Sequence, residues 1–272
     1  MLTVMTGDTH VVQDGRADAP AVLLIQNAVT PPALWDPVIP ALAEAYRVIR
    51  VDLLGRVSPG AGPAGAAGYD VPAQARRAGA VLDELGVDRV TAIGHSSGGM
   101  VATALAEQRP GTVAALALVN TGPSLAAKIP DSLATRLLNA PLARRLLWRL
   151  KTAETIRRAA GTAFTRPVSI PSALIEHTEA MPYRSFALTM RGYRDYLSQR
   201  SMPGRLGGLG LPVLVLFGAQ DRRWRSASAG VYRDVPGARV EMLPGVGHTP
   251  MMEDPLTTAS LLLDFVASGS PA

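Results

Sequence analysis

A serine inside a glycine-rich pentapeptide is the first residue whose surroundings suggest chemistry. The segment Gly94-His95-Ser96-Ser97-Gly98 follows an apolar run at 90–93 and precedes a helical pattern. A G-x-S-x-G sequence between a strand and a helix is typical of a sharp turn that presents a serine hydroxyl to a cleft. The five residues alone also fit an ordinary glycine and serine turn. Their context favours Ser96 as a nucleophile, with the Ser97 N–H directed at a developing oxyanion.

A carboxylate and an imidazole follow two later apolar runs. Asp221 comes just after the run that ends at Phe217, and His248 lies in a glycine loop after the next run. A serine hydroxyl needs a base to take its proton, and the base needs an acceptor that fixes its tautomer. The order Ser96, Asp221, His248 therefore predicts a catalytic triad.

Few other titratable side chains compete for these roles. The chain has four histidines, and His95 is expected to form a local hydrogen bond beside the nucleophile, whereas His10 and His177 are expected on the surface or on a lid. Glu253 and Asp254 follow His248 too closely to reach its far ring nitrogen. Asp221 is therefore the preferred partner of the base.

Apolar runs and helical patterns alternate along most of the chain. Two short runs before Asp14-Gly15 are typical of a β-hairpin. Further strands are predicted at 21–25, 47–53, 90–93, 114–119, 211–217 and 239–243, and helices at 71–85, 99–108, 227–232 and 256–266. This alternation predicts an α/β fold with a doubly wound, mostly parallel sheet.

The alternation is interrupted after Gly122 by Arg-rich amphipathic helices with repeated prolines. Residues 122–205 hold fourteen Lys and Arg against five Asp and Glu. We predict a helical cap at 122–205, inserted into a core made of 1–121 and 206–272. One helix face of the cap is expected to pack on the core, or instead to lie on an anionic membrane or attract an acidic carrier protein; it comprises Leu142, Leu146, Leu147 and Leu150.

The composition limits the remaining classes of function. The 272 residues include no cysteine, which excludes disulfide scaffolds, thiolate catalysis and zinc ribbons. No apolar run approaches the roughly 20 residues of a membrane-spanning helix, and no targeting segment is visible, so we expect a cytoplasmic protein without membrane insertion. The net charge of +5 comes from the basic residues of 122–205 and does not predict nucleic-acid binding. The absence of a phosphate loop and of a ligand cluster predicts no cofactor and no metal.

Taken together, the motifs resemble the α/β-hydrolase family across the whole chain apart from 122–205. Beside GHSSG, the chain has Asp52-Leu53-Leu54-Gly55 after the fourth strand and a strand that leads into Gly218-x-x-Asp221. It also has Gly247-His248-x-x-x-x-Glu253-x-Pro255 near its end. The resemblance is to the esterase, lactonase and carbon–carbon hydrolase branch, and it implies a helical lid after the sixth strand that shapes the acyl pocket.

Two positions depart from the family pattern. Gln26-Asn27 replaces the usual His-Gly after the third strand, although Trp35 keeps the expected spacing. The resemblance implies that Ala28 supplies the second oxyanion N–H, next to Ser97. The change to Gln26-Asn27 is either geometrically silent or places two amides against a particular substrate. Arg56-Val57-Ser58 stands where His-Gly-x-Ser is usual, and no role is assigned to it.

The predicted function is a serine-dependent hydrolase that acts on an ester, thioester or lactone of a hydrophobic small molecule through an acyl-enzyme. Met100, Trp224 and Met251 flank the triad in sequence and are candidate pocket residues, although methionine often fills core gaps. A non-hydrolytic cyclase or acyl-transfer enzyme for a polyketide-like substrate is the alternative, and a ligand-binding receptor is a third. Secondary metabolism is the expected context, an acyl carrier protein is a candidate partner, and a monomer or homodimer is expected.

Overall fold

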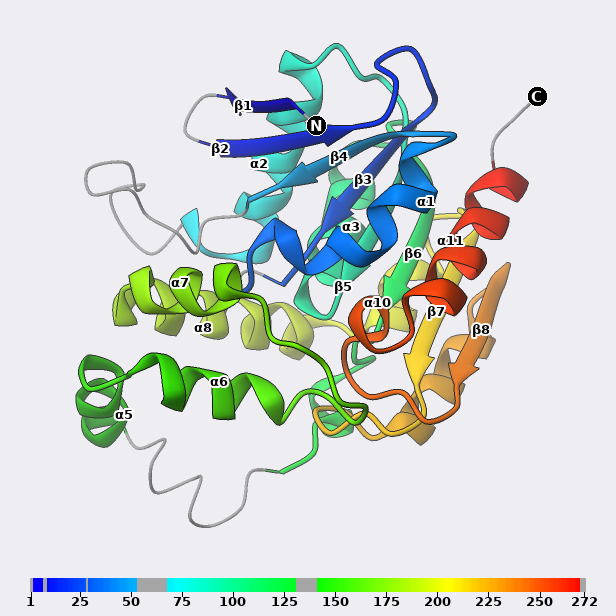
Figure 1. Ribbon diagram of the computed structural model, residues 1–272. Coiled ribbons are helices and arrows are strands. Elements are labelled where there is room, and N and C mark those ends of the chain that lie inside the picture. The colour runs from blue at the N-terminus through cyan, green and yellow to red at the C-terminus, as the bar shows by residue number, and fades with distance from the viewer. Residues whose placement is uncertain (1, 7–8, 28, 53–67, 131–140, 270–272) are drawn as a thin grey trace.

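One mixed sheet organises the chain. The computed structural model describes residues 2–6, 9–27, 29–52, 68–130 and 141–269. Within these ranges the eight strands run in the order β1-β2-β4-β3-β5-β6-β7-β8 (Figure 1). The hairpin of β1 (Leu2–Thr6) and β2 (Thr9–Asp14) is antiparallel, and β2 pairs antiparallel with β4 (Arg47–Val51). The other neighbours are parallel: β3 (Ala21–Ile25), β5 (Val90–His95), β6 (Val113–Val119), β7 (Val213–Gly218) and β8 (Ala238–Leu243). The predicted doubly wound, mostly parallel sheet is confirmed.

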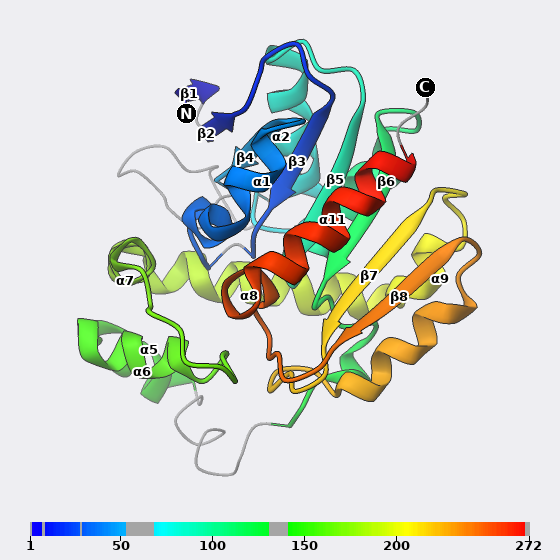
Figure 2. The same cartoon turned by 45° about the vertical axis from the view of Figure 1, so that its right-hand side comes forward.

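Helices cover both faces of the sheet, which explains why the central strands are apolar throughout. One core layer lies between the strands and α2 (Val71–Glu84), α3 (Ser97–Gln108) and the 3-10 helix η4 (Ser226–Asp234). The other lies against η1 (Pro32–Val38), α1 (Ile39–Ala43), α10 (Pro250–Glu253) and α11 (Pro255–Gly269). Figure 2 shows α1 and α11 in front of the strands, with α2 behind them.

Both ends of α2 carry residues typical of helix termini. The Asp70 side chain accepts the N–H of Ala73 at 2.6 Å and so caps the helix, and Pro72 lies in the first turn. Gly86 follows the helix with φ of +63°, a conformation that favours glycine.

A helical insertion lies between β6 and β7. It contains η3 (Leu125–Ala127), α5 (Pro141–Arg149), α6 (Ala153–Gly161), α7 (Ser172–Ala180), α8 (Tyr183–Gln199) and α9 (Met202–Leu206). Helices α5 to α8 lie beyond the carboxyl ends of the central strands (Figure 1). Tyr193, Tyr196 and Leu197 of α8 join the core layer of α2 and α3. The division into a core and a cap at 122–205 stays a prediction.

Of the alternatives given for the leucine face of α5, packing on the core does not hold for three of its members. Leu146, Leu147 and Leu150 are 58%, 46% and 63% exposed. The inward contact of α5 comes instead from Trp148, whose ring stacks on Phe186 of α8 with ring centroids 4.4 Å apart. A large aromatic side chain gains more from burial than a leucine and therefore sets the orientation of this short helix.

Some of the predicted features fall outside the described residues. These are Ala28, Leu53-Leu54-Gly55 and Arg56-Val57-Ser58. In the part of the chain that the structure describes, every helix is too short or too polar to cross a bilayer.

Candidate active site

Ser96 occupies the turn between β5 and α3. Strand β5 ends at His95 and helix α3 begins at Ser97, so Ser96 alone makes the change of direction, with φ of 55° and ψ of −119°. A non-glycine residue with positive φ is strained and persists only where its surroundings hold it. The Ser96 N–H donates to the Val119 carbonyl at 2.8 Å, and the Thr121 hydroxyl donates to the Ser96 carbonyl at 2.8 Å. The end of β6 therefore fixes the turn.

The glycines of the pentapeptide are required by close backbone approach. A Cβ atom at Gly98 would collide with the carbonyl of Ile25 in β3, and one at Gly94 would collide with the backbone of Gly99. Only glycine allows the turn to fit between β3 and the first turn of α3.

The three residues predicted as a triad converge in space. The Nε2 atom of His248 lies 3.1 Å from the Ser96 hydroxyl oxygen, and its Nδ1 atom lies 2.8 Å from Oδ2 of Asp221. Both distances are within hydrogen-bond range. Asp221 and His248 are each 7% exposed, whereas Ser96 is half-buried. The hydroxyl is therefore the member of the group that a small molecule can approach most readily.

The carboxylate of Asp221 accepts hydrogen bonds on both oxygens. Oδ2 accepts the amide N–H of Asn120 at 2.6 Å, and Oδ1 accepts the backbone N–H groups of Arg223 at 2.6 Å and Trp224 at 3.2 Å. Burial alone raises the pKa of Asp221, but the charge and hydrogen bond of His248 and the bonds from Asn120 and Arg223 outweigh it, so the pKa lies below its usual value. Asp221 stays ionised and can hold the imidazole.

Asn120 is a site residue that the sequence analysis missed. It is fully buried at the end of β6 with φ of 48°, and its amide also donates to the Gly247 carbonyl at 3.1 Å. Its Oδ1 accepts the N–H of Gly218 at 3.2 Å. Asparagine is one of the few residues that tolerates left-handed backbone. The signal available in the sequence is an amide directly after the continuous apolar run of β6.

His95 forms the local hydrogen bond predicted for it. Its Nε2 donates to the His248 carbonyl at 2.8 Å. Burial and, secondarily, the charge of His248 lower the pKa of His95 to about 3, so the ring is neutral. The neighbouring Trp35 ring lies nearly perpendicular to it, with ring centroids 6.4 Å apart. His95 thus supports the backbone of His248 and does not itself titrate near neutral pH.

The expected oxyanion donors are only partly described. Ser97 is the first residue of α3, where an N–H has no acceptor within its own helix and sits at the positive end of the helix dipole. Ala28 lies outside the described residues.

Each of the two side-chain amides after β3 makes a hydrogen bond within the protein, whereas Oε1 of Gln26 is buried with no partner among the described residues. Gln26 is fully buried and donates through Nε2 to the Val51 carbonyl of β4 at 2.9 Å. The Oδ1 atom of half-buried Asn27 accepts the N–H of Val29 at 3.1 Å. These contacts favour the geometrically silent interpretation of Gln26-Asn27 over a direct contact with substrate.

The apolar residues proposed as pocket walls differ in accessibility. Met100 is 2% exposed and belongs to the core layer of α3, and Met251 is fully buried in the opposite layer. Trp224 is half-buried, and a Cβ atom at Gly122 would collide with its ring. The burial of the two methionines favours gap filling, whereas Trp224 keeps some exposed surface.

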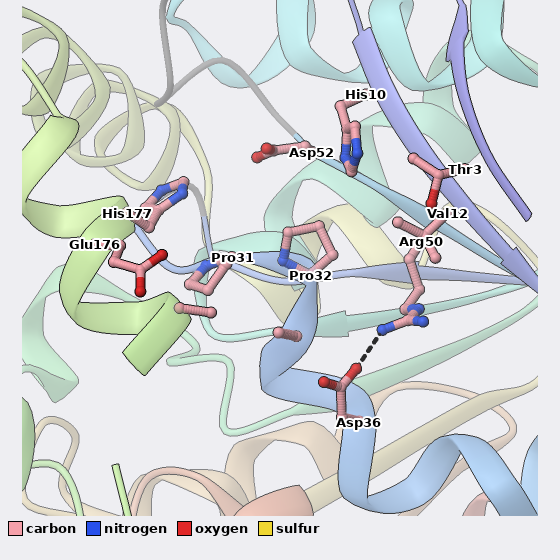
Figure 3. Close-up of a pocket in the computed structure, with 12 residues that line it drawn as sticks. Thr3, His10, Val12, Pro31, Pro32, Asp36, Arg50, Asp52, Glu176 and His177 are labelled. Atoms are coloured by element: carbon pink, nitrogen blue, oxygen red, sulfur yellow. Dashed lines mark hydrogen bonds and ion pairs between the residues drawn. The ribbon is translucent and has the colours of Figure 1, made fainter. Parts of the chain in front are cut away.

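A separate hollow of about 300 Å³ lies between the core and α7 (Figure 3). Figure 3 shows His177 and Glu176 reaching in from α7 toward Pro31 and Pro32, while Arg50 points toward Asp36. Of the two places expected for His177, the surface does not hold: the residue lies on α7 of the insertion and is 4% exposed, because α7 packs against the η1 segment. The triad residues do not line this hollow.

Comparison with known proteins gives the family. A model described as "Alpha/beta hydrolase family" matches residues 28–261. The chain is 26% identical to the putative 2-succinyl-6-hydroxy-2,4-cyclohexadiene-1-carboxylate synthase of Bacillus subtilis, with 98% of each chain covered. It is 30% identical to the putative carbamate hydrolase RutD of Variovorax paradoxus, with 95% of this chain and 96% of the relative covered.

A solved structure supports the same fold. The structure described as a putative aryl esterase from Burkholderia cenocepacia superimposes with a TM-score of 0.79 at 22% identity, and 98% of each chain is covered. Because the family model spans most of the sequence, this chain belongs to the alpha/beta hydrolase family of enzymes.

Proposed function

We propose that the protein is a serine hydrolase that cleaves an ester, thioester or lactone of a hydrophobic small molecule through an acyl-enzyme. The observation that carries the proposal is the continuous chain of hydrogen-bond distances from Ser96 through His248 to Asp221. A serine hydroxyl becomes a nucleophile when a base held in one tautomer takes its proton. The strained backbone of Ser96 supports it, since such strain is concentrated at functional sites.

In the proposed reaction the Ser96 oxygen attacks the substrate carbonyl while its proton moves to Nε2 of His248. The Nδ1–H of the resulting imidazolium donates to Asp221, which remains ionised. The N–H groups of Ser97 and Ala28 are the proposed donors to the oxyanion. His248 then returns the proton to the leaving group, and a water molecule activated by the same imidazole releases the acid from Ser96.

Burst kinetics on a short-chain p-nitrophenyl ester test this mechanism. An acyl-enzyme predicts one rapid equivalent of p-nitrophenol per site when deacylation is the slower step. Ser96→Ala should lose the burst and nearly all turnover, while the control Ser198→Ala, at an exposed serine of α8, should match the wild type. Full activity of folded Ser96→Ala would refute covalent catalysis.

A non-hydrolytic reaction at the same site is the second candidate. It is favoured by the similarity to a relative named as a synthase. A cyclase or lyase predicts a product with no added water, and an acyl-transfer enzyme predicts a product joined to an acceptor. Mass spectrometry of products formed in H₂¹⁸O separates these outcomes, because hydrolysis places one labelled oxygen in the acid.

We also propose that residues 122–205 act as a lid that shapes the acyl pocket. The position of α5 to α8 beyond the carboxyl ends of the strands supports this role, since ligands of open α/β sheets bind at those ends. Because the insertion is basic, an acidic acyl carrier protein remains a candidate partner of the protein.

A further inference from the structure

Glu253 is a buried carboxylate that takes no part in the chain from Ser96 to Asp221. It ends helix α10 and is 7% exposed. Its Oε2 atom accepts the backbone N–H groups of Thr165 at 2.8 Å, Arg166 at 3.0 Å and Gly247 at 2.9 Å. Its Oε1 atom accepts the N–H of Thr249 at 3.1 Å. A single side chain therefore gathers four peptide donors from two distant segments.

Two of these donors flank the proposed base. Gly247 and Thr249 are the residues before and after His248, and both N–H groups point to Glu253. The N–H of His248 itself donates to the carbonyl of Ala163 in the insertion at 3.0 Å. Because every one of these peptide donors has its acceptor outside the loop 247–249, the position of the imidazole depends on those acceptors.

The other two donors belong to a segment of the insertion that also contacts the Asp221 loop. The Thr165 hydroxyl donates to the Gln220 carbonyl at 3.1 Å, and the Arg223 guanidinium donates to the Thr162 hydroxyl at 2.6 Å. Residues 162–166 thus lie against the loops of both the acid and the base. We name this stretch the brace segment.

The contact between the brace segment and the base loop is tight. A Cβ atom at Gly247 would lie 2.8 Å from the Thr165 hydroxyl oxygen, 2.9 Å from Oε1 of Glu253 and 3.0 Å from the Ala163 carbonyl. The guanidinium of Arg166 holds the start of the same loop, since it donates to the carbonyls of Pro244 and Gly245 at 3.2 and 3.1 Å.

We propose that Glu253 is a positioning residue for the base, and that through the brace segment it makes the position of His248 depend on the helical insertion. The inference rests on the proposed function. Catalysis needs the imidazole within hydrogen-bond distance of the Ser96 hydroxyl, and a displacement of about 1 Å can cost roughly a hundredfold in rate. If the Glu253 carboxylate is lost, the backbone N–H groups on both sides of His248 and two N–H groups of the brace segment lose their acceptor at the same time.

The test uses Glu253→Gln in the full chain. The glutamine has nearly the same shape, but its NH₂ group replaces one oxygen and faces the peptide donors, so at least one hydrogen bond is lost. Glu241→Gln, at a partly exposed residue of β8, is the matched control. The rate of labelling of Ser96 by a fluorophosphonate and the low-field proton resonance of the His248 Nδ1–H are measured for each protein.

The proposal predicts that Glu253→Gln, with an unchanged circular dichroism spectrum, is labelled about 10- to 100-fold more slowly and has a shifted or broadened resonance. A role in stability alone would leave both readouts unchanged in the folded protein. Arg166→Ala removes the contacts of a partly exposed guanidinium to the carbonyls of Pro244, Gly245 and Glu253 and its ion pair with Asp254, but it keeps the Glu253 carboxylate and its four peptide donors. It should slow labelling of Ser96 about 3- to 10-fold, because it loosens only part of the loop that carries His248.

The variants keep the two proposals separate. If the wild type is not labelled at Ser96, the proposed function fails. If the wild type is labelled and both variants match it in rate and resonance, only the positioning role of Glu253 is refuted. If Glu253→Gln does not fold, Arg166→Ala decides the result by the same two readouts.

Discussion

Replacement of His95 should change how the stability of the protein depends on pH. The ring is 1% exposed, and burial, with a smaller contribution from the charge of His248, lowers its pKa from 6.5 to about 3. Between these two values the unfolded chain binds a proton at His95 and the folded chain does not. Stability therefore rises with pH across this window and is lost as the pH falls below about 6.5.

The size of the effect follows from the two pKa values. One pKa unit corresponds to about 1.4 kcal/mol, and pH 5 lies 1.5 units below the pKa of the unfolded state. His95 should therefore lower the free energy of unfolding by about 2 kcal/mol between pH 8 and pH 5. Asp221 contributes in a lower range, since its depressed pKa gives stability that is present above about pH 4 and lost below it.

Urea denaturation at pH 8 and pH 5 measures this difference. His95→Gln keeps an amide that can donate to the His248 carbonyl but does not titrate. The wild type should lose about 2 kcal/mol more than the variant when the pH is lowered to 5. Equal losses in the two proteins would mean that His95 is protonated in the folded state or is exposed, and the reasoning would be refuted.

Three further substitutions test the geometry of the site. Asp221→Asn should lower kcat on an activated ester by about 10⁴-fold, because an amide no longer stabilises the imidazolium; a loss below tenfold would argue against Asp221 as the partner of His248. Asn120→Ala should lower the free energy of unfolding by about 2–4 kcal/mol, since it removes three buried hydrogen bonds and leaves alanine at positive φ; urea denaturation that shows under 0.5 kcal/mol would contradict the role described. Gly98→Ala should destabilise the protein by about 2 kcal/mol or more through collision with the Ile25 carbonyl, whereas Gly161→Ala, whose added Cβ meets open space, should be neutral or stabilising in the same melt.

Much of the fold follows from local patterns in the sequence. The strand at Ala21–Ile25 has the predicted bounds, because a short apolar run between polar turns has few alternatives. The motif around Ser96 could be interpreted because strand, turn and helix follow one another in sequence. The pairing of Asp221 with His248 was predictable because both lie just after neighbouring parallel strands, whose ends share one edge of the sheet.

The remaining features depend on contacts between distant segments. Asn120 meets Asp221 across 101 residues, and Glu253 meets Thr165 across 88, so no local periodicity signals either contact. From the sequence, Glu253 could be considered only as a partner of the His248 ring, and it was excluded because it follows that residue too closely. Its actual partners near the base are the backbone N–H groups of the residues on both sides of His248. The exposed face of α5 was misassigned because the leucines and Trp148 compete for the inward direction, and only the position of Phe186 decides between them.

The most direct test of the central claim is the mass of the protein after reaction with a fluorophosphonate, followed by peptide mapping. We predict a single adduct on Ser96, abolished in Ser96→Ala and strongly slowed in His248→Ala, because the reagent reacts with a serine only when a base activates it. Folded wild-type protein that stays unlabelled, or that carries the adduct on another serine, would contradict the assignment of Ser96 as the nucleophile.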